Sequence, residues 1–138
     1  MTKITDPRQL AVVTLNELEE SEDFLREVLD FHIGQNALKS IDQGLYTELV
    51  YGTVRMRDNL DYIISLFSSR PLRKIQATIL NILRLGVYQI LYLDRVPESA
   101  AVNEAVKLAR LFGHEGVAKF ANAVLRQVVR KRDSIRYP

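Results

Sequence analysis

Apolar residues recur every three or four positions along most of this chain, which is the spacing of amphipathic helices. We expect helices at about residues 7–18, 24–33, 40–67, 74–93, 100–112 and 117–132. Within 40–67 the pattern weakens at Gly52 and at Arg57-Asp58-Asn59, so this stretch is either one long bent helix or two helices in tandem. The pattern therefore predicts six or seven helices.

Signals for helix starts and ends frame these segments. The expected starts are the Asp6-Pro7 pair, the capping box of Ser40 with Gln43, and Ser99. The expected ends are Gly34 and Gly113. Because no segment alternates apolar and polar residues, and no hairpin turn joins two runs, we predict no strands.

The stretch 74–93 is the most apolar, and Arg70-Pro71 separates it from the preceding helix. Such a broad stripe predicts a central helix packed on most of its sides. The other helices would pack their single stripes around it, in a compact all-α bundle. The residues expected inward are Ile75, Ile79, Ile82, Leu83, Gly86 and Ile90 of the central helix, and Ala11, Leu15, Leu18, Leu25, Val28, Leu29, Leu45, Leu49, Val50, Leu60, Ile63, Ile64, Phe67, Val102, Ala105, Val106, Ala109, Val117, Ala121, Val124, Leu125 and Val128 of the others.

Composition agrees with one globular domain spanning residues 1–138. Hydrophobic residues make up 47% and charged residues 26%, which excludes a disordered chain. Asn81, Arg84 and Gln89 interrupt the longest apolar run, so we expect no membrane span, and the first residues lack the apolar region of a secretory signal. The chain has no cysteine, which favours a cytoplasmic location.

The residues needed for catalysis are missing from the sequence. Metal binding needs clustered ligands, but His32 and His114 are single and far apart, and are expected to be surface or capping residues. The carboxylate pair Glu19-Glu20 lies in an acidic stretch with no apolar pocket to raise a pKa. We therefore expect this chain alone to be no enzyme, with no catalytic residue, no metal and no cofactor of its own.

Charge is distributed unevenly along the sequence. Residues 1–70 hold 7 Lys+Arg against 12 Asp+Glu, and residues 71–138 hold 12 against 5. The most basic stretch covers the last predicted helix and its C-terminal end, with Arg126, Arg130, Lys131 and Arg132. Such a bias points to a polyanionic partner, although basic residues also suit the negative end of a helix dipole.

Several polar residues interrupt otherwise apolar stripes. Asn103 and Asn122 either pin helix ends or loops, or belong to a binding surface, because buried polar groups need partners. Arg84 forms either an ion pair with Glu48 or Glu104, or a phosphate contact. Four tyrosines at helical spacing are expected at the edge of the core rather than as base-stacking platforms: Tyr46, Tyr51, Tyr88 and Tyr92.

Five short motifs in a fixed order carry a resemblance to a known family. They are residues 51–55 (YGTVR), 70–72 (RPL), 83–91 (LRLGVYQIL), 96–106 (with VP and AAVNEAV) and 122–126 (NAVLR). Each motif alone is weak, but five in order are specific. From Arg8 to about Arg132 the chain resembles a NusB-type domain.

Two branches share that fold, the NusB transcription antitermination factors and the N-terminal domain of the Sun/RsmB (Fmu) 16S rRNA cytosine-C5 methyltransferases. The chain is more similar to the second branch. The arginine-rich first helix of NusB is reduced here to Arg8, and Gly116 stands where NusB tends to carry an acidic residue used against its ribosomal-protein partner.

The methyltransferase resemblance implies a non-catalytic domain that binds or positions small-subunit rRNA. It implies truncation before a C-terminal methyltransferase domain, which would bind S-adenosylmethionine and supply the cysteine nucleophile that this chain lacks. By match to the family, Arg8, Lys119, Phe120 and Asn122 would lie near the RNA. The basic stretch adds Arg126, Arg130, Lys131 and Arg132 to the expected RNA-binding residues.

Two alternatives remain open at this point. The chain could be a stand-alone antitermination factor that binds boxA-like RNA together with a ribosomal protein. It could also be a docking module that contacts its own catalytic domain and touches RNA little. A parent reading frame that continues past Pro138 into a cofactor-binding domain would exclude the first alternative, and salt-dependent RNA binding would count against the second.

Overall fold

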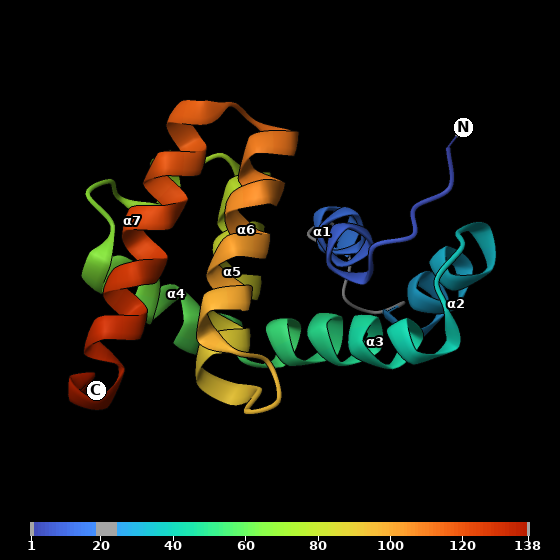
Figure 1. The fold of residues 1–138 in the computed structure, drawn as a ribbon, viewed down its shortest axis with the longest axis horizontal. Coiled ribbons are helices and arrows are strands. Elements are labelled where there is room, and N and C mark those ends of the chain that lie inside the picture. Colours follow the sequence, from blue (N-terminus) through green and yellow to red (C-terminus); the bar gives the residue numbers. More distant parts are fainter. Residues whose placement is uncertain (1, 19–24, 138) are drawn as a thin grey trace. The chain divides into compact units, whose positions relative to one another are not determined.

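The computed structural model describes residues 2–18 and 25–137, and every regular element in this part of the chain is helical (Figure 1). The all-α prediction is confirmed. Residues 1–55 and 56–138 form two compact units, called here the N-terminal and C-terminal units. The first holds α1 (Pro7–Leu18), α2 (Leu25–Gln35) and α3 (Ser40–Arg55); the second holds α4 (Arg57–Phe67), α5 (Ala77–Tyr92), α6 (Glu98–Phe112), α7 (Glu115–Lys131) and two short 3-10 helices, η1 (Leu72–Lys74) and η2 (Arg132–Ser134).

Helix α1 begins where the Asp6-Pro7 pair predicts. An Asp6 carboxylate oxygen accepts a hydrogen bond from the Arg8 backbone N–H at 2.9 Å, which satisfies a free amide of the first turn. The helix packs against α2 and α3. Its predicted stripe is buried, as are Leu10 and Val12 beside it.

The ends of α2 and α3 differ from the predictions. Gly34 does not end α2, which continues to Gln35, and Phe24 lies outside the described residues, as do Glu19 and Glu20. Ser40 is already helical rather than a cap. The Gln43 side chain donates to the Leu38 carbonyl at 3.5 Å, so the predicted capping box does not form.

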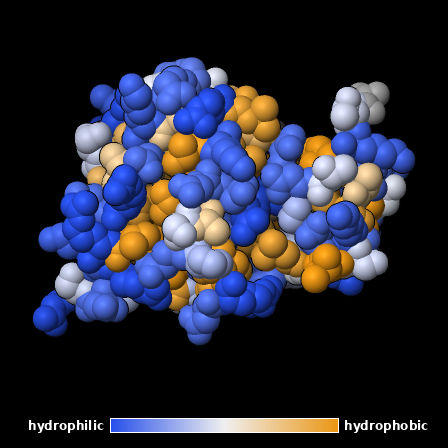
Figure 2. Space-filling view, viewed as in Figure 1, coloured by the Kyte–Doolittle hydropathy of each residue, from blue (hydrophilic) through white to orange (hydrophobic). Residues whose placement is uncertain are grey.

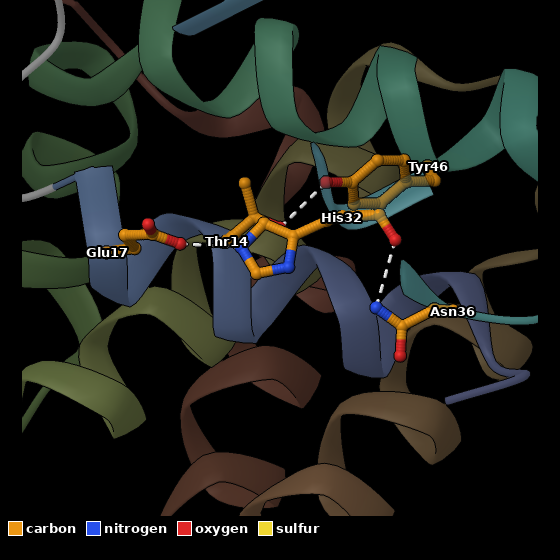
Figure 3. Close-up of polar contacts among 5 residues, drawn as sticks. All are labelled: Thr14, Glu17, His32, Asn36 and Tyr46. Carbon is orange, nitrogen blue, oxygen red and sulfur yellow. Dashed lines mark hydrogen bonds and ion pairs between the residues drawn. The ribbon is translucent and has the colours of Figure 1, made fainter. Parts of the chain in front are cut away.

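Polar contacts tie the three helices of the N-terminal unit together (Figure 3). Tyr46 is fully buried, deeper than the predicted core edge, and its hydroxyl lies 2.7 Å from that of Thr14. Burial raises the pKa of Tyr46 to about 12, although the Thr14 hydrogen bond opposes this shift. His32 contacts Glu17, and the Asn36 amide donates to the His32 carbonyl at 2.9 Å. The contact of His32 with Glu17 joins α2 to α1.

The stretch 40–67 forms two helices in tandem, as one of the two predicted alternatives has it. Helix α3 ends at Arg55 and α4 begins at Arg57. Between them Met56 has φ −99° and ψ 13°, outside the helical region. The boundary between the two units falls at this residue.

Helix α5 is the centre of the C-terminal unit. All its residues from 81 to 90 are buried, and it packs against α4, α6 and α7, as predicted. It begins at Ala77 rather than Lys74, because Ile75 and Gln76 have extended backbone after η1. At Gly86 a β-carbon would lie 2.9 Å from a Leu125 methyl carbon, so this glycine allows α7 to pack closely on α5.

Arg84 forms the predicted structural ion pair, with Asp61 as a partner that the sequence analysis did not name. Its Nε and Nη2 donate to the two carboxylate oxygens of Asp61 at 2.7 and 2.9 Å, and its Nη1 donates to Asn81 at 2.9 Å. Glu104, one of the two expected partners, pairs instead with Lys107 at 3.6 Å. The contact therefore joins α4 to α5 through a planar, bidentate pair.

The turn between α6 and α7 is built on Gly113 and His114. Helix α6 ends at Gly113 as predicted, where a β-carbon would lie 2.4 Å from a Val117 methyl carbon. His114 caps α7: its Nδ1 accepts from the Gly116 backbone N–H at 3.0 Å. The expected cap of α6 is wrong, because the helix starts at Glu98 after Pro97 and Ser99 is already helical.

Candidate nucleic-acid interface

Helix α7 presents an outward polar face opposite its buried stripe. Ala121, Val124, Leu125 and Val128 are buried, as predicted. Lys119, Asn122, Arg126 and Arg130 follow one another at three- or four-residue spacing and therefore share one side of the helix. Four of the eight residues predicted to bind RNA are thus brought together.

A groove runs between this side of α7 and helix α6. Its volume is about 360 Å³, and its lining consists of an apolar floor with polar rims: Val102 and Val129, then Glu98, Ser99, Asn103, Asn122, Arg126 and Arg130. The two helices pack directly against each other. Figure 2 shows hydrophilic side chains over much of the surface above α6 and α7, with small apolar areas between them.

The polar side chains of the groove are available to a ligand. Among the described residues, Asn103, Asn122, Arg126 and Arg130 have no hydrogen-bond or ion-pair partner. The interpretation of Asn103 and Asn122 as pins of helix ends is therefore wrong in the part of the chain that the structure describes. Amide and guanidinium groups that have no partner within the protein can bind anions and base edges.

Arg132 has a partner within the unit. Its Nη1 lies 3.4 Å from a carboxylate oxygen of Glu98, and this oxygen is buried without a hydrogen bond. The pair links the end of α7 to the start of α6 at one end of the groove. Part of the charge of Arg132 is thereby neutralised before any ligand binds.

Phe120 and Lys131 lie on the other side of α7, next to α4. The ring of Phe120 is half-buried, and the guanidinium of Arg70 lies 5.3 Å from its centre, a cation–π distance. Lys131 lines a separate hollow with Tyr62 and Leu66. These two predicted residues are therefore not part of the groove.

Arg8 belongs to the N-terminal unit, in the first turn of α1. It is half-buried. The basic residues of α7 belong to the other unit.

The charge difference along the sequence coincides with the two units. Residues 1–55 carry 5 Lys+Arg and 10 Asp+Glu, whereas residues 56–138 carry 14 and 7. Unequal charge on separate units makes the C-terminal unit a source of positive potential. Within it, the outward face of α7 lacks acidic residues from 116 to 132.

Two further classes of site are absent from residues 2–18 and 25–137. No group of three or more His, Cys, Asp or Glu residues is placed there to hold a metal ion. No helix in these ranges is long and apolar enough to cross a membrane.

The sequence does not predict the α6 side of the groove. The sequence predicts Ser99 as a cap and Val102 as core, and it assigns no role to Glu98, yet all three line the groove. Their spacing across the first turns of α6 is compatible with a shared face, but the register against α7 depends on the turn at Gly113-His114. That register could not be derived from spacing alone.

Comparison with known proteins identifies close relatives in two groups. The "Probable ribosomal RNA small subunit methyltransferase B" of Bacillus subtilis is 39% identical over 94% of this chain, and that of Synechocystis is 37% identical over 91%. The chain spans only 29% and 28% of these relatives' own length. The "Transcription antitermination protein NusB" of Baumannia cicadellinicola is 33% identical, with 86% of this chain and 85% of that protein covered.

Solved structures show the same fold. The NusB chain in a complex of antitermination factors NusB and NusE with dsRNA has a TM-score of 0.79 at 22% identity, covering 90% of this chain and 93% of that one. A T. maritima NusB has a TM-score of 0.71 at 19% identity, with 93% and 94% covered. The NusB family model matches residues 5–130. Because this match covers most of the chain and the predicted fold is confirmed, the chain belongs to the NusB family.

Proposed function

We propose that this chain is a non-catalytic RNA-binding domain of an rRNA (cytosine-C5) methyltransferase, which positions small-subunit rRNA for a separate catalytic domain. The two methyltransferase relatives support this proposal, because their identity is higher than that of the antitermination proteins cited above. Under the proposal, the remaining length of those relatives corresponds to the catalytic part. A cytoplasmic location, where rRNA is modified, belongs to the same proposal.

The observation that carries the proposal is the outward face of α7. Lys119, Arg126 and Arg130 lie there with Asn122, and none of these four forms an ion pair among the described residues. Guanidinium and ammonium groups that neutralise RNA phosphates release condensed counterions, which supplies affinity without sequence preference. Such contacts fix the register of the RNA while the chemistry takes place elsewhere.

The proposal places binding of the methyl donor outside this chain. S-adenosylmethionine sites of this reaction class are built on a sheet edge with a glycine-rich loop, and residues 2–18 and 25–137 contain no strand. The sequence also has no cysteine to attack the cytosine ring. The proposal therefore assigns donor binding and methyl transfer to another domain.

The remaining predicted contacts form a weaker part of the proposal. Arg8 belongs to the N-terminal unit, Phe120 and Lys131 do not line the groove, and one side of the Phe120 ring is already covered by Arg70. Arg132 contributes less than Arg126 because Glu98 accompanies it. We expect substitutions at these four residues to affect RNA binding less than substitutions at Arg126 and Arg130.

The experiment measures binding of the purified chain to labelled fragments of small-subunit rRNA by fluorescence anisotropy. Arg126→Gln/Arg130→Gln is compared with Arg73→Gln/Lys74→Gln, a control that removes the same charge from exposed residues of the same unit. The first variant should bind about tenfold more weakly, and its log–log salt slope should fall by about 1.4, the value for two single-strand phosphate contacts. The control should stay near wild type.

Equal weakening of both variants would mean that only net charge matters, and would refute the assignment to α7. Absence of binding at low salt would refute the RNA-binding function. The docking module that touches RNA little would then be the better reading.

A second candidate function is antitermination. It is favoured by the NusB relatives, because the match to this chain covers 85% or more of their own length. The partners would then be a boxA-like RNA and a ribosomal protein; the solved complex of NusB with NusE contains dsRNA. Gly116 speaks against it, because it offers no acidic group to the ribosomal protein. The two functions separate in a pull-down with the purified ribosomal protein, which should not bind this chain.

A further inference from the structure

The groove between α6 and α7 has a feature that charge alone does not explain. Its floor is apolar, formed by Val102 and Val129, while its rims carry amide, guanidinium and carboxylate groups. A surface that only attracts phosphates needs no apolar floor. A planar aromatic ring with polar edges fits this combination, because its face can contact the valines while its edge meets the amides.

We propose that this groove holds one unpaired nucleotide of single-stranded RNA, with a preference for a base that carries an exocyclic amino group. The proposal rests on the RNA-binding function above and specifies what the α7 face recognises. The base lies on Val102 and Val129, and the side chains of Asn103 and Asn122 contact its edge.

The arrangement of the cations favours one nucleotide. Arg126 and Arg130 are separated by four residues, about 6 Å along the helix, so each can hold a different phosphate. A groove of about 360 Å³ lies near the lower end of the range for small-ligand pockets. A base inside a duplex is stacked on both faces and cannot enter it, so unpaired RNA is the fitting ligand.

The preference for an amino base follows from Glu98. Its carboxylate lines the groove, and its side chain is 40% exposed. A carboxylate accepts hydrogen bonds and is repelled by carbonyl oxygens. The amino group of cytosine or adenine can donate to it, whereas uracil presents a carbonyl oxygen at the same position.

The test uses the tightest-binding single-stranded loop fragment of small-subunit rRNA and replaces each nucleotide in turn by an abasic one. Abasic replacement removes the base and keeps every phosphate, so it separates base recognition from charge. We expect one position at which affinity falls about tenfold while the salt slope is unchanged, the size of effect seen for loss of one stacked base. Asn103→Ala should remove most of this sensitivity, and Arg73→Gln/Lys74→Gln should retain it.

Base preference is tested at the same position by replacing cytosine or adenine with uracil. Wild type should lose several-fold in affinity, and Glu98→Gln should lose little, because a glutamine amide can donate to the uracil carbonyl. Because Glu98→Gln also frees Arg132 from its ion pair, we expect it to raise affinity for every RNA. The measured quantity is therefore the ratio of the affinities for the two RNAs.

Salt-dependent binding with no sensitive abasic position would refute the nucleotide groove and leave the RNA-binding function standing. A sensitive position without discrimination between amino bases and uracil would refute the role of Glu98. Absence of RNA binding at low salt would refute both proposals together.

Discussion

Replacing Asp61 with alanine should be one of the most destabilising single changes in the C-terminal unit. The Asp61 carboxylate accepts two of the three hydrogen bonds identified above for the Arg84 guanidinium, at 2.7 and 2.9 Å. The Arg84 side chain is only 5% exposed. Removal of Asp61 takes the bidentate carboxylate away from a buried positive charge, and water can replace that carboxylate only in part.

The expected loss follows from burial on both sides of the pair. Removing one partner of a fully buried ion pair costs about 3–5 kcal/mol. The Asp61 side chain is 25% exposed, so some solvent reaches the site and reduces the cost. We expect Asp61→Ala to lower the free energy of unfolding by about 2–4 kcal/mol. Asp61→Leu/Arg84→Met should cost less than Asp61→Ala, because no charge is then left unpaired.

The assay is urea unfolding at 25 °C followed by circular dichroism at 222 nm, since the chain has no tryptophan to report by fluorescence. Asp58→Ala is the matched control: this residue lies on the same helix and is exposed. The control should change stability by no more than about 1 kcal/mol, the value of a charge at a helix N-terminus. An Asp61→Ala protein within about 0.5 kcal/mol of wild type, the range of an ordinary surface substitution, would refute the reasoning.

Three other predictions concern packing, capping and pH. Gly113→Ala should destabilise by about 1–3 kcal/mol in thermal unfolding, because its β-carbon would overlap Val117; unchanged stability would mean that the turn relaxes freely. His114→Ala should cost about 1 kcal/mol, because the Gly116 N–H loses its acceptor, and His114→Asn should recover most of the loss. The raised pKa of Tyr46, about 12 against an ordinary 10, predicts that stability falls by about 2 kcal/mol between pH 10 and pH 12, because the unfolded chain loses this proton first. Tyr46→Phe should remove that alkaline dependence, which denaturant titrations at pH 9 to 12 can measure.

The sequence predicts which residues are buried where the apolar face of a single helix determines burial. The stripe of α5 predicts its central position, and the structure buries every residue from 81 to 90. The contact of Gly86 with Leu125 shows why the stripe includes a glycine. Apolar spacing carries this information because the same residues must be removed from water in any packing of these helices.

Helix boundaries are less predictable because several signals compete for each end. At α6, Pro97 precedes the helix and fixes its own φ, so the helix starts before the serine that resembles a cap. At α7, a histidine takes the capping position that propensities give to Ser, Thr, Asp or Asn. Gly34 lies within α2, since glycine permits a helix to end but does not force it to.

Pairings between distant residues could not be derived from the sequence. The pairing of Asp61 with Arg84 depends on how α4 lies against α5. Glu48, Glu104 and Asp61 carry the same charge, so charge alone could not select Asp61 as a partner. The α7 residues proposed to bind RNA were predicted from charge and family resemblance. The groove needed the register of α6 against α7, which placed Asn103 and Glu98 opposite Arg126 and Arg130.

The most direct test of the RNA-binding account is to locate the RNA on the protein. Single-stranded small-subunit rRNA fragments carrying 4-thiouridine are cross-linked to the purified chain, and the modified tryptic peptides are identified by mass spectrometry. We predict adducts on the α7 peptide 120–126 and on the peptide 96–107 that contains the α6 rim of the groove. Cross-links confined to residues 1–55, or spread equally over the surface of the C-terminal unit, would contradict the central claim.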